Sequence, residues 1–315
     1  PREVQESLTK ACVKEAVEEY GGELLHSTAR SEYSIRRMER MMLRTVWAIC
    51  LQVQQGGFVP SNFEVPFSTA ELSAVNLQLE GTDTMRLRGR IDRIDVCEDK
   101  DQVYVKVVDY KSGSTEFDLV AMYYGLQLQL VVYLNAAMEL EGRIRPEKEI
   151  VPAGIFYYHI KDPMLEASVK SDLGDLEQKI LKELRPDGLV NQDPGVIEKL
   201  DHHIEKDSAV IPVSINKDGS LSKTSKAADK GQFRAMSGFV RRKLGELGKE
   251  ILEGRTEMDP YERGNKKACD YCPYREICCF DPKIPGNHYR RLKELKAEEI
   301  FMRMEEEDHG YDLDT

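Results

Sequence analysis

Two short stretches decide the fold: Gly89-Arg-Ile-Asp92-Arg-Ile-Asp95 and Val107-Val-Asp109-Tyr-Lys111-Ser-Gly113. Both are rich in alternating or β-branched residues, which is typical of strands. The polar residues at 98–101 between them have the composition of a turn. The sequence therefore predicts a β-hairpin.

The hairpin brings charged side chains together at one end. Because side chains alternate between the two faces of a strand, Asp109 and Lys111 share a face, and Asp92 lies on the neighbouring strand. Carboxylate oxygens suit Mg²⁺ or Mn²⁺, and a lysine beside the metal can orient water and offset charge on a phosphoryl group. The alternative for each aspartate is an ordinary turn or strand-end residue, because a lone D-x-K triplet is common by chance.

Outward from the hairpin, the hydrophobic pattern changes between helical and strand periods. The elements predicted in the first half are a helix to about residue 55, strands at 58–67, 85–96 and 102–110 with a turn at 81–83, a helix at 118–140 and a strand at 150–160. The second half is predicted to contain short helices at 175–184 and 196–206, a short strand at 209–213 and a long helix at 227–252. This order predicts an α/β protein with a mixed sheet and helices packed against it.

Two further motifs follow the hairpin. Gln129 and Tyr133 are four residues apart on the predicted helix at 118–140 and present polar groups from one helix face, although such a helix is also ordinary core material. Near the C-terminus, Cys269-Asp-Tyr-Cys272 is followed by Cys278 and Cys279. The C-x2-C-x5-C spacing favours zinc or an iron-sulfur cluster over packed core cysteines, and each of these groups usually takes four ligands.

Composition limits the class of protein. The chain has 315 residues, 41% of them hydrophobic, so it can bury a sizeable core. Seven cysteines are too few for a disulfide scaffold of this length, which indicates a reducing compartment. No apolar stretch is long enough for a membrane span and no signal peptide is recognisable. The first residue is proline, so we expect the chain to be part of something longer.

The net charge of −11 argues against a nucleic-acid partner, but the charge is unevenly distributed. Residues 301–315 carry six acids and one base, and we expect an acidic tail there. Residues 217–243 carry eight bases and two acids. The candidate contacts to a nucleic-acid backbone are Arg36, Arg37, Lys223, Lys226, Lys230, Arg234, Arg241 and Arg242.

Taken together, G-x-x-D-x-x-D, D-Y-K, Q-x-x-x-Y and C-x2-C-x5-C resemble the RecB-type branch of the PD-(D/E)XK nucleases, and within it the AddB family of bacterial helicase-nuclease subunits. The resemblance extends from about Arg30 to Pro282. It implies a restriction-endonuclease-like mixed central sheet flanked by helices, with a C-terminal cysteine-cluster extension.

The resemblance also implies roles for individual residues. Asp92, Asp109 and the backbone carbonyl of Tyr110 would bind Mg²⁺, Lys111 would be the catalytic lysine, and Gln129 and Tyr133 would lie near the scissile strand. Cys269, Cys272 and Cys278 would be three ligands of a 4Fe-4S cluster. The family's fourth cysteine and its metal-binding histidine occur in patterns that this chain lacks, so we expect both to precede Pro1 and the isolated fragment to have incomplete sites.

The function expected from the resemblance is Mg²⁺-dependent exonucleolytic cleavage of DNA single strands. It would serve an ATP-dependent helicase-nuclease in double-strand break repair and recombination, with an AddA-like subunit as partner, in the bacterial cytoplasm. The alternatives are a non-catalytic DNA-binding or scaffold module with a structural metal, and a CRISPR-associated iron-sulfur exonuclease. The predicted divisions of the chain are an N-terminal helical part at 1–56, a nuclease core at 57–160, a mainly helical elaboration at 161–258, a cysteine segment at 259–285 and an acidic helix or tail at 286–315.

Overall fold

The structure is a computed structural model that describes residues 1–67, 72–79, 81, 83–165 and 173–311. Thr82 of the predicted turn and residues 312–315 of the predicted tail lie outside the described residues. A central sheet contains, in spatial order, β1 (Val59–Pro66), β4 (Arg90–Glu98), β5 (Gln102–Lys111), β6 (Glu149–His159), β7 (Asp187–Asn191) and β8 (Ala227–Ala228). The sheet is mixed: β5–β6 and β7–β8 are parallel and the other pairs are antiparallel. The predicted hairpin is therefore confirmed as β4–β5.

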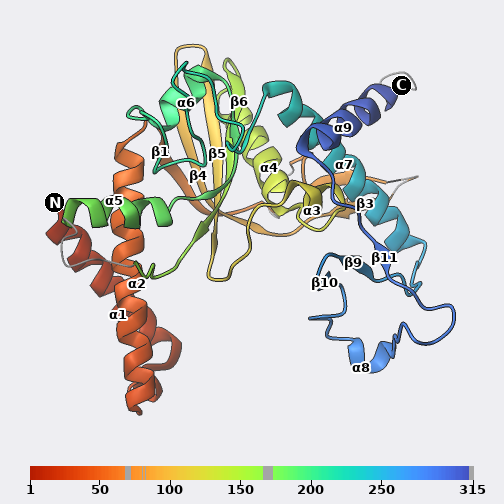
Figure 1. Ribbon diagram of the computed structural model, residues 1–315, viewed down its shortest axis with the longest axis horizontal. Helices are drawn as coiled ribbons and strands as arrows, with labels where there is room; N and C mark the ends of the chain where they lie inside the picture. Colours follow the sequence, from red (N-terminus) through yellow and green to blue (C-terminus); the bar gives the residue numbers. More distant parts are fainter. Residues whose placement is uncertain (68–71, 80, 82, 166–172, 312–315) are drawn as a thin grey trace.

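Helices and small strands surround this sheet (Figure 1). The helices are α1 (Arg2–Leu25), α2 (Ala29–Gln54), α3 (Leu119–Tyr123), α4 (Gln129–Ile144), α5 (Leu173–Glu183), α6 (Pro194–Leu200), α7 (Lys230–Leu252), α8 (Arg275–Cys278) and α9 (Ala297–Tyr311). The small strands are β2 (Asn76–Gln78), β3 (Thr84–Arg86), β9 (Tyr261–Arg263), β10 (Lys266–Lys267) and β11 (Arg290–Arg291). The mixed sheet with flanking helices confirms the predicted fold class.

The two faces of the sheet have separate cores. On one face, buried residues of α4, α7 and α9 pack with Val105, Val107 and Ile155 of the sheet. On the other face, α6 and the segment at 210–213 pack against Val108 and Phe156. Because α4 contacts both β5 and β6, it places its polar residues over the end of these two strands.

Several of the predicted elements are wrong in detail. The N-terminal helix is divided at 26–28 into α1 and α2, the strand expected at 85–96 is divided at 87–89 into β3 and β4, and the helix expected at 196–206 ends at Leu200. The helix expected at 118–140 is two helices, because Gly125 takes a positive φ of 81° between α3 and α4. The long helix begins at Lys230 rather than 227, because Asp229 accepts a hydrogen bond from the backbone N–H of Gln232 in a capping box. Residues 209–213 are not a strand, although 210–213 are buried, since the Ser208 hydroxyl bends the backbone there by accepting from two successive N–H groups. The neighbouring strand β7 was not predicted.

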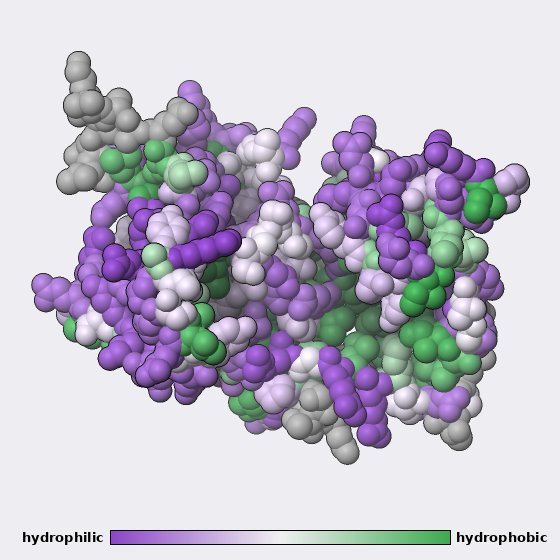
Figure 2. Space-filling view, turned by 90° about the horizontal axis from the view of Figure 1, so that it is seen from below, coloured by the Kyte–Doolittle hydropathy of each residue, from purple (hydrophilic) through white to green (hydrophobic). Residues whose placement is uncertain are grey.

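In the part of the chain that the structure describes, no helix is both long and apolar enough to cross a membrane. Seen from below, the molecule is covered mainly by hydrophilic side chains, with apolar ones in separate patches (Figure 2).

Candidate nuclease active site

The candidate site lies where β4 and β5 separate. Their paired residues extend from Glu98–Val103 to Arg93–Val108. Beyond this point the backbone N–H of Tyr110 donates to Oδ2 of Asp92 at 2.8 Å. The Asp92 carboxylate is therefore held against the end of β5, beside Asp109.

The five predicted catalytic residues lie together. The ammonium group of Lys111 is 2.6 Å from Oδ2 of Asp109 and donates to Oε1 of Gln129 at 3.1 Å. Gln129 in turn donates from Nε2 to the Tyr133 hydroxyl at 2.7 Å. The structure thus joins Asp109 and Lys111 of β5 to Gln129 and Tyr133 of α4, with Asp92 alongside.

Two residues of β6 belong to the same site and were missed by the sequence analysis. Tyr157 pairs with Asp109 across the parallel β5–β6 register, and its ring centroid lies 5.2 Å from the Lys111 ammonium. His159 pairs with Lys111, and its Nε2 is 2.8 Å from the Thr115 carbonyl oxygen. The sequence could have indicated these two residues only through the polar groups at the end of the predicted strand at 150–160. Their position beside Asp109 and Lys111 depends on the parallel pairing of β5 and β6.

Burial and charge set the titration of this site. The pKa of Asp109 is raised, chiefly by burial; the Lys111 ammonium opposes this effect and the Asp92 carboxylate adds to it. Burial, followed by the charge of Asp109, raises the pKa of Tyr157 to about 12. Burial also raises the pKa of Tyr133. The tyrosines therefore remain neutral hydrogen-bonding groups around an acidic pair.

The oxygen atoms of the site fit a divalent cation such as Mg²⁺. Oδ2 of Asp109 is buried and, apart from its ion pair with Lys111, has no hydrogen-bond partner. Among the described residues, no group of three His, Cys, Asp or Glu side chains could hold a metal ion. Asp92 and Asp109 would thus be the two carboxylate ligands, and the Tyr110 carbonyl could supply a third hard oxygen.

A buried charge network supports the opposite face of the same strands. Arg93 donates to both oxygens of Asp95, at 2.8 and 2.9 Å, and to the Tyr110 hydroxyl at 2.9 Å. The Lys106 ammonium lies 3.3 Å from Oδ2 of Asp95. Because Tyr110 lies between Asp109 and Lys111 in sequence, this network holds the strand end that carries the site.

The predicted cluster cysteines are close in sequence but not gathered in space. Cys269 and Cys272 are half-buried, Cys278 and Cys279 are exposed, and all four are free thiols. The described residues contain no group of three thiols close enough together to hold a metal. Figure 1 shows α8 and its flanking chain extending away from the central sheet.

The structure separates the predicted nucleic-acid contacts into two groups. Arg36 and Arg37 are exposed on α2, whereas the other contacts lie on or just before α7. Two of these, Lys226 and Lys230, form ion pairs with Asp187 and Glu149. Three other bases of the second group are exposed and form no ion pair in the described part of the chain: Lys223, Arg234 and Arg241. Arg242 is only 17% exposed and lies 3.9 Å from Glu307.

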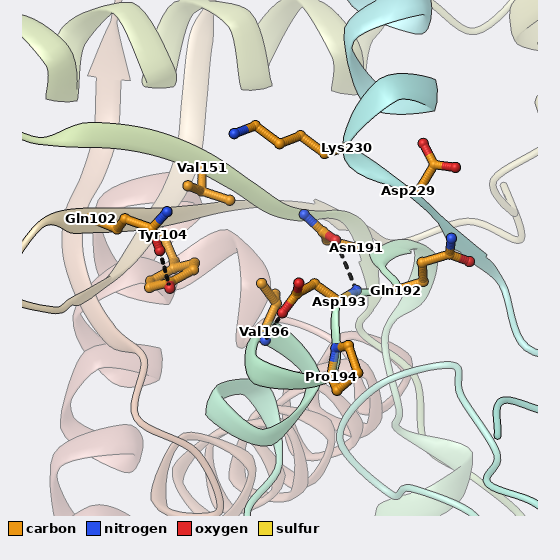
Figure 3. A pocket seen from close by; sticks show the side chains of 10 residues that line it. All are labelled: Gln102, Tyr104, Val151, Asn191, Gln192, Asp193, Pro194, Val196, Asp229 and Lys230. Atoms are coloured by element: carbon orange, nitrogen blue, oxygen red, sulfur yellow. Dashed lines mark hydrogen bonds between the residues drawn. The ribbon is translucent and has the colours of Figure 1, made fainter. Parts of the chain in front are cut away.

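A separate hollow of about 510 Å³ lies at the other end of the sheet (Figure 3). Gln102 and Tyr104 from the start of β5 line it, together with Asn191, Asp193 and Asp229. Gln102 begins β5 and Asp109 nearly ends it, so the hollow is distinct from the catalytic cluster.

Comparison with known proteins identifies the family. Residues 1–279 match the model of the PD-(D/E)XK nuclease superfamily. Relatives named as one subunit of an ATP-dependent helicase/deoxyribonuclease include that of Lachnoclostridium phytofermentans, 40% identical over all of this chain and 27% of the relative. Those of Alkaliphilus oremlandii and Thermoanaerobacter pseudethanolicus are 37% and 38% identical, over 98% and 90% of this chain and 27% and 25% of the relatives.

These matches confirm the resemblance inferred from the motifs. The chain spans about a quarter of the length of the curated relatives it matches. By its family match and the geometry at the end of β5, the chain belongs to the PD-(D/E)XK nuclease superfamily.

Proposed function

We propose that this chain is the nuclease domain of a bacterial ATP-dependent helicase-nuclease and hydrolyses phosphodiester bonds in DNA single strands with Mg²⁺. The observation that carries the proposal is the cluster in which Lys111 contacts both Asp109 and Gln129 beside Asp92. The names of the relatives, which include both helicase and deoxyribonuclease, support DNA as the substrate.

In this mechanism Asp92, Asp109 and the Tyr110 carbonyl would hold a Mg²⁺ ion, and the chemistry that such an ion would supply is polarisation of a phosphate oxygen and acidification of water. Lys111 is held between Asp109 and Gln129 and presents its ammonium group to the reacting phosphate, where it offsets developing negative charge. Gln129 fixes the Lys111 ammonium and the Tyr133 hydroxyl relative to each other through one side-chain amide. A strand-end lysine with two partners needs little rearrangement to act.

The same proposal extends to the assembly. The protein would work with an AddA-like subunit, as an exonuclease on strands released by unwinding, in double-strand break repair and recombination in the bacterial cytoplasm. The basic residues of α2 and α7 would contact the DNA backbone. The relatives are named as subunits rather than as complete enzymes, which supports a partner chain.

We also propose that Cys269, Cys272 and Cys278 bind a 4Fe-4S cluster. The C-x2-C-x5-C spacing supports this, while the described geometry would have to close around the cluster. Anaerobic purification of the full-length protein should give brown protein with visible absorption and iron. Colourless protein that contains zinc would contradict the assignment.

The catalytic assignment is tested by Asp109→Ala in the full-length protein, with end-labelled single-stranded DNA and Mg²⁺. Cleavage should be abolished while helicase activity remains. The matched control is Asp101→Ala, an exposed aspartate at the opposite end of β5. Retained cleavage in Asp109→Ala refutes the assignment. Calorimetric Mg²⁺ titration of Asp92→Ala separates the non-catalytic alternative, which predicts no metal binding that depends on Asp92.

A further inference from the structure

A row of three arginines leads along the chain to the catalytic cluster. Arg86, Arg88 and Arg90 occupy every second position and are all exposed. The residues between and after them point inward: Leu87 packs partly buried against the main core, and Ile91 is only 1% exposed. The row therefore presents three guanidinium groups on the outer side of one chain segment.

The backbone of this segment is held by the main sheet and its neighbours. Arg86 ends β3 and Arg90 begins β4. Between them, the Leu87 N–H donates to the Val75 carbonyl at 2.8 Å, and the Gly89 carbonyl accepts from the Phe67 N–H at 3.3 Å. In an extended chain, alternate residues are about 7 Å apart. This is comparable to the separation of successive phosphates in an extended single strand.

Gly89 shows how closely the segment approaches the site. A Cβ atom there would meet Cζ of Phe67 at 2.5 Å, so only glycine allows this approach. The Phe67 ring in turn packs edge-to-face on the Tyr133 ring, with centroids 5.7 Å apart. Burial has the largest effect on the pKa of Tyr133 and raises it, whereas the positive charge of Arg90 lowers it. The end of the row thus lies within electrostatic range of the catalytic cluster.

Two of the three charges have no partner among the described residues. Arg86 and Arg88 form no ion pair or hydrogen bond from their side chains within the described residues. Arg90 pairs with Glu64 at 2.6 Å, but both side chains are more than half exposed. Arg93 in the same strand is buried and paired through two hydrogen bonds with Asp95, so it is a structural arginine.

We propose that Arg86, Arg88 and Arg90 bind successive backbone phosphates of a DNA single strand and guide it to Asp92 and Asp109. This inference rests on the proposed nuclease function and names the path of its substrate. Guanidinium groups suit phosphates because their fork of N–H donors matches the phosphate oxygens. The contacts are to the backbone, so they are independent of base sequence.

The test is binding of a fluorescent oligo-dT to the full-length protein without Mg²⁺, measured by anisotropy over a series of salt concentrations. The variant is Arg86→Gln with Arg88→Gln; Arg90 is left in place because it adjoins the catalytic cluster. Each phosphate contact on a single strand contributes about 0.7 to the magnitude of the negative slope of log K against log salt. The magnitude of this slope should therefore be smaller by about 1.4 in the variant. Between about 50 and 200 mM salt, the wild type should then lose about sevenfold more affinity than the variant.

Two further variants make the result specific. Arg86→Lys with Arg88→Lys keeps both charges and should keep the wild-type slope. Lys10→Gln with Lys100→Gln removes two exposed charges from α1 and from the turn at the far end of the hairpin, and should also leave the slope unchanged. The proposed phosphate contacts are refuted if the Arg→Gln variant keeps the wild-type slope, or if the Lys10 and Lys100 control loses as much of the slope as the Arg→Gln variant does.

Failure of the row and failure of the proposed function are distinguishable. If the wild type cleaves DNA and Asp109→Ala does not, but the Arg→Gln variant keeps the wild-type slope, only the row is refuted. If the wild type neither cleaves nor binds the single strand, both the proposed function and the proposed role of the three arginines are refuted.

Discussion

Replacing Asp95 by asparagine should destabilise the protein more than any other single change in the buried charge network. Asp95 is 0% exposed and accepts two hydrogen bonds from Arg93, while Lys106 lies 3.3 Å away. The variant leaves two buried cations facing each other, without the carboxylate that pairs them. Arg93→Met should cost less, because it leaves the Asp95–Lys106 pair.

The magnitude follows from burial. Removing one partner of a buried ion pair costs about 3–5 kcal/mol of the free energy of unfolding, because the remaining charge is buried without compensation. The pKa of Lys106 is already lowered, chiefly by burial; Asp95 raises it and Arg93 lowers it further. In Asp95→Asn the pKa of Lys106 in the folded state should fall further still. The unfolded state then binds the Lys106 proton more tightly than the folded state does. Stability of the variant should therefore rise with pH.

The assay is urea unfolding of this chain followed by circular dichroism at about pH 6 and about pH 9. Glu98→Gln is the matched control, since Glu98 is an exposed acid on the same strand that pairs with Arg145 and Lys148. It should change the unfolding midpoint little. Equal losses in Asp95→Asn and Glu98→Gln, or a loss in Asp95→Asn that grows with pH, would refute the reasoning.

Three further predictions concern the site and its support. Asp109→Asn should abolish Mg²⁺-dependent cleavage yet raise the melting temperature of the metal-free protein by calorimetry, because burial raises the pKa of Asp109 and so disfavours its charge. The same raised pKa predicts that wild-type cleavage at subsaturating Mg²⁺, where protons compete with the ion for Asp109, is lost as pH falls through that pKa. The metal-free fold should instead lose stability as pH rises through it; a pH–rate profile at low Mg²⁺ like that of an ordinary exposed aspartate would contradict this. Gln129→Leu removes the hydrogen bonds to Lys111 and Tyr133 and should lower kcat about 10- to 100-fold, measured in steady-state cleavage; an unchanged kcat would make Gln129 a packing residue. Gly89→Ala should cost about 1–3 kcal/mol in urea unfolding because its Cβ meets the Phe67 ring, and a neutral result would show that the ring can move.

Local patterns in the sequence were sufficient for the hairpin and its charged end. Alternation along β4 and β5 depends only on backbone geometry, so the faces of Asp109 and Lys111 could be predicted from their spacing. The helical period over 129–144 likewise placed Gln129 and Tyr133 on one face. The break at Gly125 was missed because an apolar period continues through it, while the backbone turns at a positive φ.

The membership of the site could not be predicted completely, because it depends on which strands become neighbours. Tyr157 and His159 lie beside Asp109 and Lys111 only through the parallel β5–β6 register, which pairs residues 48 apart in sequence.

The sequence by itself determined the class of fold, the acidic pair and the lysine, because strand and helix periods are local properties of the chain. Only the tertiary structure decided how α4 meets the end of β5, how the Arg93–Asp95–Lys106 network supports that end, and how the arginine row adjoins Tyr133 through Gly89 and Phe67. These contacts arise from long-range packing and burial. Burial, in turn, sets the pKa of Asp109.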